Sequence, residues 1–499
     1  MIRNYSLIRS IFATNLATFL LIGFLACGGG SGKGGGNPPP PAATTLMQFK
    51  LGDAESDRVL SFTATLDSLA LVSSSGKITN LLASPMTVEL TRTAGKMQTL
   101  AQLQIPQGSY TAVNYQVSNI YITAWDVPYD TFSDFVGSGS MPRSITLNPS
   151  IIVGATPQII YLDLNLRDSI SFDNNGDILV DPQFSAGALD IGPIDSQIAE
   201  DGNAEDMIGV VQNVATSSFT MSLGSGSNTV QVGFDSGTQG QSAALLARDA
   251  LVEVDAITRA DGSFYANRID FVESGNLALV EGVVIGPTSW PPGLPPASDS
   301  ATIVVQKVWA PAQTPAPNVG DWVTLTGLGT AGYSFDYDKL DSWGQGYLTF
   351  SNSSLWTGQS VLALVNPGTS TLNVIDMKLV EIAVNGVISG YDPQQYGFSL
   401  NIPADSAYQN VVNLMPQTYL SVWDQAENKT VWFGFPQGGP QNGMPVRVRG
   451  LAFWTWQMGY MPGGPTMVPT RIDYLPVATA AAQSRHAAGQ RLQRKATAK

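Results

Sequence analysis

The sequence predicts an all-β protein: an N-terminal antiparallel sandwich followed by about three small β-barrel-like units. From Thr45 onward, apolar residues recur at about every second position, as in half-buried strands; residues 61–71 and 159–166 are clear examples. Turn-forming clusters such as Pro106-Gln107-Gly108 separate these segments. Helical spacing is rare, residues 241–248 being the best short candidate. Antiparallel sandwiches and barrels are therefore the expected packing.

Residues 1–27 have the anatomy of an export signal that ends in the only cysteine of the 499-residue chain. Arg3 and Arg9 form a positive start, and residues 16–26 form an apolar core that is too short to span a bilayer. Cys27 has no partner for a structural disulfide. We expect a lipoprotein signal peptide with Cys27 as the lipidation site; the other interpretation is a simple secretory signal.

The segment Phe24-Leu25-Ala26-Cys27 resembles the lipobox of bacterial lipoproteins, in which the thiol receives a diacylglycerol and the signal is cut before it. The resemblance implies a protein of the bacterial cell envelope that is attached to the membrane by a lipid anchor. The residue after the cysteine is Gly28 and not an aspartate. By analogy with lipoprotein sorting, this favours the outer membrane as the place of the anchor. Residues 28–44, a glycine run and four prolines, form a tether with a reach of roughly 25–30 Å.

Residues 45–194 are expected to form the sandwich domain. Residues 163–182 are expected to form a hairpin around Asn175-Gly176. Three further features are the start Leu51-Gly52-Asp53-Ala54, the central Pro106-x-Gly108-x-Tyr110, and a closing hairpin with Arg167-Asp168-Ser169-Ile170 followed by Asp181-Pro182. In these features, residues 46–192 resemble a bacterial lipoprotein family of unknown function that has a prealbumin-like or immunoglobulin-like sandwich. The resemblance implies a fold and no activity.

After an acidic linker at residues 195–206 the chain repeats itself. The repeats open with similar Gly-containing segments and close with similar acidic ones. The openings are Ile208-Gly209-Val210-Val211, Glu281-Gly282-Val283-Val284 and Asn385-Gly386-Val387-Ile388, and the endings are Arg268-Ile269-Asp270, Val374-Ile375-Asp376 and Arg471-Ile472-Asp473. We expect barrel units at residues 207–275, 279–382 with an insertion at 311–356, and 383–477, followed by a basic tail at 478–499. The pattern is similar to small bacterial barrel domains of unknown function with an OB-like shape.

Composition excludes several function classes. The net charge of −14 argues against nucleic acid as a partner. One cysteine and one histidine, His486 in the tail, cannot build a Ser-His-Asp triad, a Cys-His pair or a His/Cys zinc centre. We therefore expect no catalytic residues, no cofactor and no metal. A carboxylate-only glycan hydrolase stays open as an alternative, and Asp336, Asp338 and Asp341, which alternate with aromatic residues, are its candidate acids.

Tryptophans gather in the second half of the chain, where nine of the ten lie at or after residue 290. Trp454 and Trp456 would project from the same face of a strand, with Tyr460 close by in sequence. Such a surface could stack on sugar rings or bind a protein; the other interpretation is hydrophobic core. The leading hypothesis is a lipid-anchored envelope protein with a non-catalytic binding or scaffolding role toward a glycan or a protein.

Overall fold

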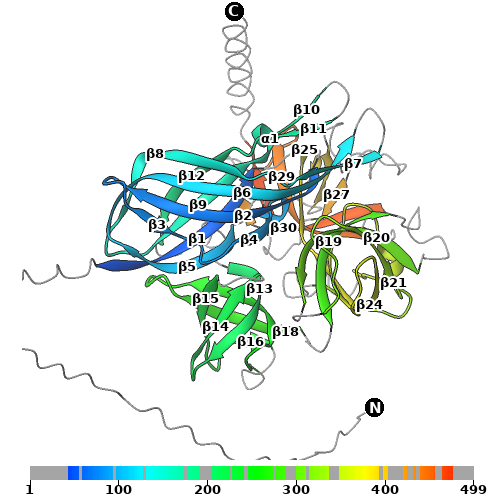
Figure 1. Cartoon of the computed structure of the whole chain (residues 1–499). Coiled ribbons are helices and arrows are strands. Elements are labelled where there is room, and N and C mark those ends of the chain that lie inside the picture. Colours follow the sequence, from blue (N-terminus) through cyan, green and yellow to red (C-terminus); the bar gives the residue numbers. More distant parts are fainter. Residues whose placement is uncertain are drawn as a thin grey trace, which may run out of the picture. The chain divides into compact units, whose positions relative to one another are not determined.

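The fold was established from a computed structural model, which describes residues 43–54, 59–93, 97–126, 131–173, 177–191, 204–224, 228–240, 246–272, 277–286, 299–310, 314–335, 348–392, 397–402, 420–423, 431–433, 439–455 and 464–475. The predicted all-β class is confirmed (Figure 1). In the described ranges the one α-helix is the four-residue α1 (Leu166–Ser169). None of the described helices has the length and apolarity needed to cross a membrane. Residues 43–499 form one compact unit.

The N-terminal domain is a sandwich of two sheets. The first has the order β12-β9-β1-β5 and consists of β1 (Thr44–Ala54), β5 (Gln98–Pro106), β9 (Gln158–Asn165) and β12 (Phe184–Asp190). The second has the path β3-β2-β6-β7, with β4 on β2 and β8 on β6; it consists of β2 (Val59–Ser73), β3 (Ile78–Asn80), β4 (Met86–Glu89), β6 (Gly108–Asp126), β7 (Thr131–Gly137) and β8 (Met141–Val153). The short 3-10 helix η1 (Thr91–Thr93) follows β4.

Two details refine the expected antiparallel sandwich. β1 and β9 pair in parallel, with Phe49 opposite Ile160, because the chain crosses between the sheets before β9 begins. The hairpin expected around Asn175-Gly176 is confirmed by the antiparallel pairing of β10 (Ile170–Phe172) with β11 (Ile178–Val180).

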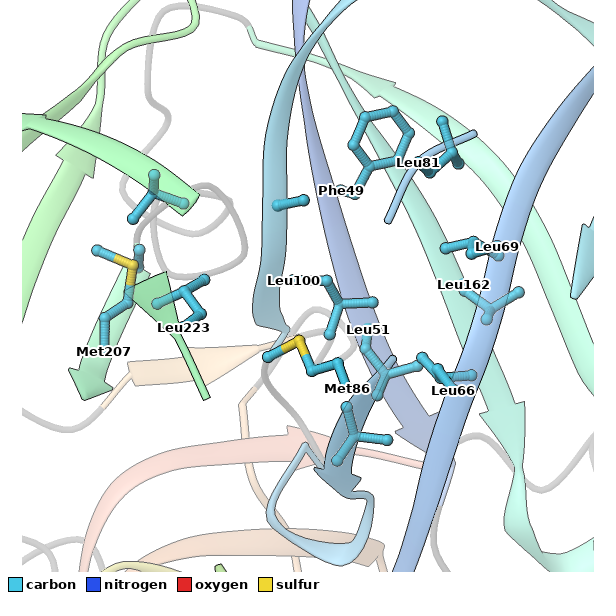
Figure 2. Packing of buried hydrophobic residues seen from close by; sticks show 14 of the residues in the cluster. Phe49, Leu51, Leu66, Leu69, Leu81, Met86, Leu100, Leu162, Met207 and Leu223 are labelled. Atoms are coloured by element: carbon cyan, nitrogen blue, oxygen red, sulfur yellow. The ribbon is translucent and has the colours of Figure 1, made fainter. Parts of the chain in front are cut away.

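The sandwich core comes from the alternation seen in the sequence. Inward residues of β1 and β2, such as Phe49, Leu51 and Leu66, have no more than 1% of their surface exposed. The same apolar cluster continues into the next domain, where Met207 and Leu223 belong to it (Figure 2). The sandwich and the first barrel are therefore joined by shared apolar packing.

Three six-stranded units follow, and their strand orders are the same. In each, five strands, numbered one to five along the chain, close into a small barrel because the third also pairs with the fifth. A short additional strand, called the sixth, lies between the third and the fourth in the sequence and pairs with the fifth. Barrel 1 consists of β13 (Ala204–Val214), β14 (Ser218–Leu223), β15 (Thr229–Gly233), β16 (Gln239–Gly240), β17 (Leu251–Thr258) and β18 (Phe264–Val272). β13 begins within the segment expected to be linker.

Barrel 2 consists of β19 (Ala278–Gly286), β20 (Ser300–Trp309), β21 (Trp322–Thr326), β22 (Gly332–Phe335), β23 (Ser360–Val365) and β24 (Thr371–Val380), with the 3-10 helix η5 (Asn352–Ser354) before β23. Barrel 3 consists of β25 (Ile382–Asp392), β26 (Gly397–Asn401), β27 (Leu420–Trp423), β28 (Val431–Phe433), β29 (Pro445–Thr455) and β30 (Gly464–Tyr474). The repeated openings of the sequence are thus the first strands of three like barrels.

The glycine of each opening has one structural reason. Gly209, Gly282 and Gly386 each pair with a fully buried valine on the fourth strand of their barrel. A Cβ on Gly209 would lie 2.4 Å from the Ser222 carbonyl oxygen, and one on Gly282 would lie 2.4 Å from that of Val304. A Cβ on Gly386 would lie 2.6 Å from Leu400 Cγ. Only glycine allows the second strand to approach this closely.

The repeat endings differ from the expectation in barrel 2. Strand register places Asp376-Met377-Lys378, and not Val374-Ile375-Asp376, at the position of Arg268-Ile269-Asp270, because Met377 pairs with Ala363 as Ile269 pairs with Val254. The supposed insertion also contains β21 and β22, which are regular barrel strands. Sequence similarity of two residues was too weak to fix this register.

The first barrel is held to the sandwich by buried polar contacts. Asn228, 2% exposed, accepts from Ala83 N at 2.8 Å and donates to the Ser84 carbonyl at 2.9 Å. Gln48, fully buried, donates to the Gly262 carbonyl at 3.0 Å. Buried hydrogen bonds are directional, so these contacts fix the orientation of barrel 1 as well as its proximity.

Barrels 1 and 2 meet through an apolar cluster and an ion pair. Ile208 and Leu251 of barrel 1 pack with Leu279, Leu362 and Val380 of barrel 2. At the same interface, Lys378 Nζ lies 2.9 Å from each carboxylate oxygen of Glu253.

Candidate functional site

An open groove of about 570 Å³ lies on barrel 1. Its size falls in the range of small-ligand sites. Glu205 comes from β13, Gln239 from β16 and Asp255 from β17, whereas Tyr265, Asn267 and Arg268 come from β18, and Asp235 lies between β15 and β16. The groove therefore runs along β18 and the short sixth strand.

Asp235 is fixed in place by the turn that carries it. Its Oδ1 accepts a hydrogen bond from Gly237 N at 2.7 Å, and its own N–H donates to Thr238 Oγ1 at 3.2 Å. The hydroxyl of Thr238 in turn donates to the Ala266 carbonyl at 2.9 Å, which ties the turn to β18. A side chain held in this way needs little further ordering when a ligand binds.

Tyr265 and Asp235 form one hydrogen-bonded pair. The hydrogen bond from the Tyr265 hydroxyl, followed by that from Gly237 N, lowers the pKa of Asp235 below its usual value. The same bond raises the pKa of Tyr265. The Arg259 guanidinium lies 3.5 Å from the centroid of the Tyr265 ring, a cation–π contact that fixes the ring. Asp235 is thus a carboxylate suited to accept hydrogen bonds, and not a proton donor.

The chemistry of the groove is that of planar polar groups. Glu205, Asp235 and Asp255 offer carboxylate oxygens, and Gln239 and Asn267 offer amides that both donate and accept. Arg268 is the cation of the lining, and its Nε donates to Asp270 at 2.6 Å. Three carboxylates against one guanidinium make the lining electronegative, which disfavours a polyanionic ligand. Hydroxyl-rich neutral molecules match such a set, because each hydroxyl can donate to a carboxylate and accept from an amide.

The residues predicted from the sequence lie largely outside the described ranges. Cys27, the acid cluster Asp336, Asp338 and Asp341, and the aromatic residues Trp456 and Tyr460 are among these. Trp454 belongs to β29, where it pairs with Pro465 across the strands, and its side chain is not described. Among the described tryptophans, Trp356 is core at 1% exposure, whereas Trp322 is 44% exposed.

Sequence reasoning missed the groove because its residues are dispersed over about 60 positions. A signal was present in β18, where Tyr265 and Asn267 alternate just before the repeat ending and Arg268, after a register shift, is its first residue. Without the barrel closure, nothing indicated that Asp235 would face Tyr265.

Comparison with known proteins gives two family matches and no activity. Residues 44–182 match the family model described as "Domain of unknown function (DUF4382)", and residues 208–270 match "Domain of unknown function (DUF5666)". No curated protein matches the chain. Among solved structures, a chain titled "drosophila Unr CSD456" is similar at 10% identity, with 55% of this chain and 98% of that chain covered. Its TM-score of 0.12 is too low for any argument about this protein.

Proposed function

We propose that the protein is a lipid-anchored protein of the bacterial envelope that binds a neutral glycan without cleaving it. The single observation that supports binding most is the groove on barrel 1, whose carboxylates and amides are presented on hydrogen-bonded strands and one fixed turn. The lowered pKa of Asp235 supports a role as hydrogen-bond acceptor, since hydrolysis by two carboxylates needs an acid whose pKa is raised.

The binding part is tested by affinity electrophoresis of the purified protein through gels that contain neutral polysaccharides. Asp235→Asn and Asn267→Ala should each weaken retention, because each removes one partner of a ligand hydroxyl. Asp190→Asn is the matched control, since this exposed carboxylate lies on β12 of the sandwich. Equal retention of all variants would remove the groove from the proposal, and release of new reducing ends would replace binding with hydrolysis.

The aromatic surface expected at Trp454, Trp456 and Tyr460 is a second candidate contact for the glycan, and the same assay tests it. If a glycan extends beyond the groove, Trp454→Ala and Trp456→Ala should also reduce retention through lost stacking. Retention that these variants leave unchanged would confine the ligand contact to barrel 1.

The anchor is tested separately. Support comes from the lone Cys27 at the end of the export signal, followed by the glycine tether. The full-length protein produced in a Gram-negative host should partition with membranes and carry acyl chains on its N-terminal cysteine, detectable by mass spectrometry. Cys27→Ala should release it to the soluble fraction, since two or more buried acyl chains are what make such attachment stable. An unlipidated, soluble wild-type protein would contradict the proposal.

A further inference from the structure

One end of the sandwich gathers several strand ends around the first described residue of the chain. Ala43 accepts a hydrogen bond from Gln107 N at 2.8 Å, directly before β6 begins. The turn between β2 and β3 lies at the same end, because Ser74 N donates to the Ser109 carbonyl of β6 at 2.9 Å. The chain that leads back to Cys27 therefore leaves the sandwich at this end.

Two isoleucines are exposed on the outer face of the second sheet at this end. Ile78 of β3 is 60% exposed, and Ile152 of β8 is 61% exposed. Ile152 lies opposite Ser109 of β6, and both of its neighbours in the chain belong to the apolar core, so its side chain points outward. Ile78 lies opposite Val72 of β2, which in turn lies opposite Ala112 of β6, and these two are half-buried. We propose that the isoleucine face, formed by Ile78, Val72, Ala112 and Ile152, contacts the surface of the membrane that holds the lipid anchor.

The charge of this end favours a membrane as the occupant. The chain has a net charge of −14, so a surface that contains acidic phospholipids repels most of the molecule. Four segments form this end and contain no Asp or Glu: residues 43–47, 72–80, 104–112 and 148–158. Asp190, which accepts from Gln158 at 2.8 Å, belongs to β12 of the other sheet. Lys77 is the one charged residue of the four segments and is exposed directly before Ile78. Its ammonium group can pair with lipid phosphates while the isoleucine side chains enter the interface.

The tether makes a weak contact sufficient. Residues 28–42 separate Cys27 from Ala43. A short flexible linker holds the two surfaces that it joins at an effective concentration in the roughly millimolar range, so a contact of low intrinsic affinity is still occupied. Docking would also fix the orientation of a domain that the tether alone leaves free to turn. The inference rests on the proposed lipid anchor and does not depend on what the groove binds.

The test uses the full-length acylated protein in vesicles of phosphatidylethanolamine and phosphatidylglycerol. Acylation of the one native cysteine leaves no free thiol, so Ile152→Cys provides a single site for a fluorescent label. In a second set of vesicles the acyl chains carry bromine, which quenches fluorophores that enter the membrane. We expect the label at residue 152 to be quenched at least about twofold by the brominated lipid, because side chains that contact the surface reach the boundary between headgroups and acyl chains.

Val136→Cys is the matched control for the label. Val136 is 68% exposed on β7 of the same sheet and lies opposite Tyr121. Tyr121 and Ser109, the partner of Ile152, are far apart along β6, at roughly 40 Å for about 3.3 Å per residue. The label at residue 136 should therefore not be quenched.

A second comparison introduces a negative charge into the isoleucine face. Ile78→Asp should reduce the quenching of the label at residue 152, because a carboxylate is repelled by acidic lipid and is costly to bury. Leu179→Asp places the same charge at a 53% exposed leucine of β11 and should leave the quenching unchanged. Both substitutions replace exposed side chains, so both variants should keep the wild-type Tm.

The outcomes separate the contact from the anchor. Absence of acyl chains on Cys27 would contradict the anchor, and the contact with it. Acylated protein whose label at residue 152 is quenched no more than the label at residue 136 would overturn the contact alone, as would equal quenching in the Ile78→Asp and Leu179→Asp variants. A label at residue 152 that is already shielded from water without vesicles would mean that the tether or a second copy covers the face, and would overturn the contact as well.

Discussion

Barrels 1 and 3 have the same strand order, but the same outer face is an open groove in one and is buried in the other. In barrel 1, Asp255 lies opposite Arg268, and both line the groove. At the equivalent positions of barrel 3, Arg449 lies opposite Arg471, and each is only 5% exposed. The inward residues beside them are alike, Val254 and Ile269 against Val448 and Ile472. The inward residues are thus alike because they form the core of each barrel, while the outward residues differ according to what surrounds them.

Barrel 2 is a third version of the same face. Leu364 stands opposite Asp376 there, and Leu364 packs against the apolar cluster between barrels 1 and 2. The outer face of barrel 2 thus contacts another barrel, and the outer face of barrel 3 is buried around ion pairs. The face of barrel 1 is left open, which is why we place the ligand there.

The largest expected effect comes from breaking the same ion pair in the two barrels. Arg471 Nε lies 2.7 Å from Asp473 with both side chains under 10% exposed, and Arg268 Nε lies 2.6 Å from Asp270 with both near 32% exposed. Arg471→Met should cost about 3 kcal/mol, because it leaves the buried Asp473 carboxylate with the Arg447 guanidinium, 3.9 Å away, as its remaining ion-pair partner. Arg268→Met should cost no more than about 1 kcal/mol. Urea unfolding measures both; equal costs would show that burial does not distinguish the two faces.

The shared interior is tested by the opening glycines. Gly209→Ala, Gly282→Ala and Gly386→Ala should each destabilise the protein by roughly 1–3 kcal/mol, since each methyl group would meet the neighbouring strand. Gly139→Ala is the control, because its Cβ would meet nothing within 4 Å. The three costs should agree in sign and approximate size in urea unfolding. A glycine that tolerates alanine would show that its barrel closes differently.

These glycines also show how far the sequence could lead. Alternation and turn residues predicted the fold class, and the three openings predicted three units, because local pattern reflects which side of a strand faces the core. The groove was beyond reach. It depends on closure of β15 onto β18, which brings Asp235 to Tyr265. Long-range pairing of this kind has no local signature.

The next effect separates two ways of burying a carboxylate. Glu381 is paired with Arg449, whereas Glu89 of the sandwich is held by uncharged donors: Ser61 Oγ at 3.0 Å, Phe62 N at 3.2 Å and the backbone and hydroxyl of Thr91. Burial raises the pKa of Glu89 above its ordinary value of 4.5, and these hydrogen bonds offset only part of the increase. The folded state therefore favours the protonated carboxyl.

The sign of the pH dependence follows. Between pH 4.5 and the raised pKa, the folded protein binds more protons at Glu89 than the unfolded chain, so stability falls as pH rises through this window. The slope from this group is at most about 1.4 kcal/mol per pH unit. Glu89→Gln should remove that slope, which urea unfolding at several pH values measures against the wild type. A slope that persists unchanged in the variant would mean that Glu89 does not titrate in this range.

The smallest effect tests whether the open face of barrel 1 is as ordered as the buried face of barrel 3. Asp235 raises the pKa of the Tyr265 phenol through their hydrogen bond, and Arg259 acts in the opposite direction through its positive charge. Asp235→Asn should therefore lower the Tyr265 pKa toward its ordinary value of 10, and Arg259→Gln should raise it further. Phenol titration followed by NMR, with Tyr265→Phe to assign the signal, measures both shifts. Opposite shifts require that the two contacts persist in solution, as a groove with preset hydrogen-bonding groups demands. If neither variant moves the Tyr265 pKa, the groove is not held in this arrangement and the contrast between an open and a buried face loses its functional meaning.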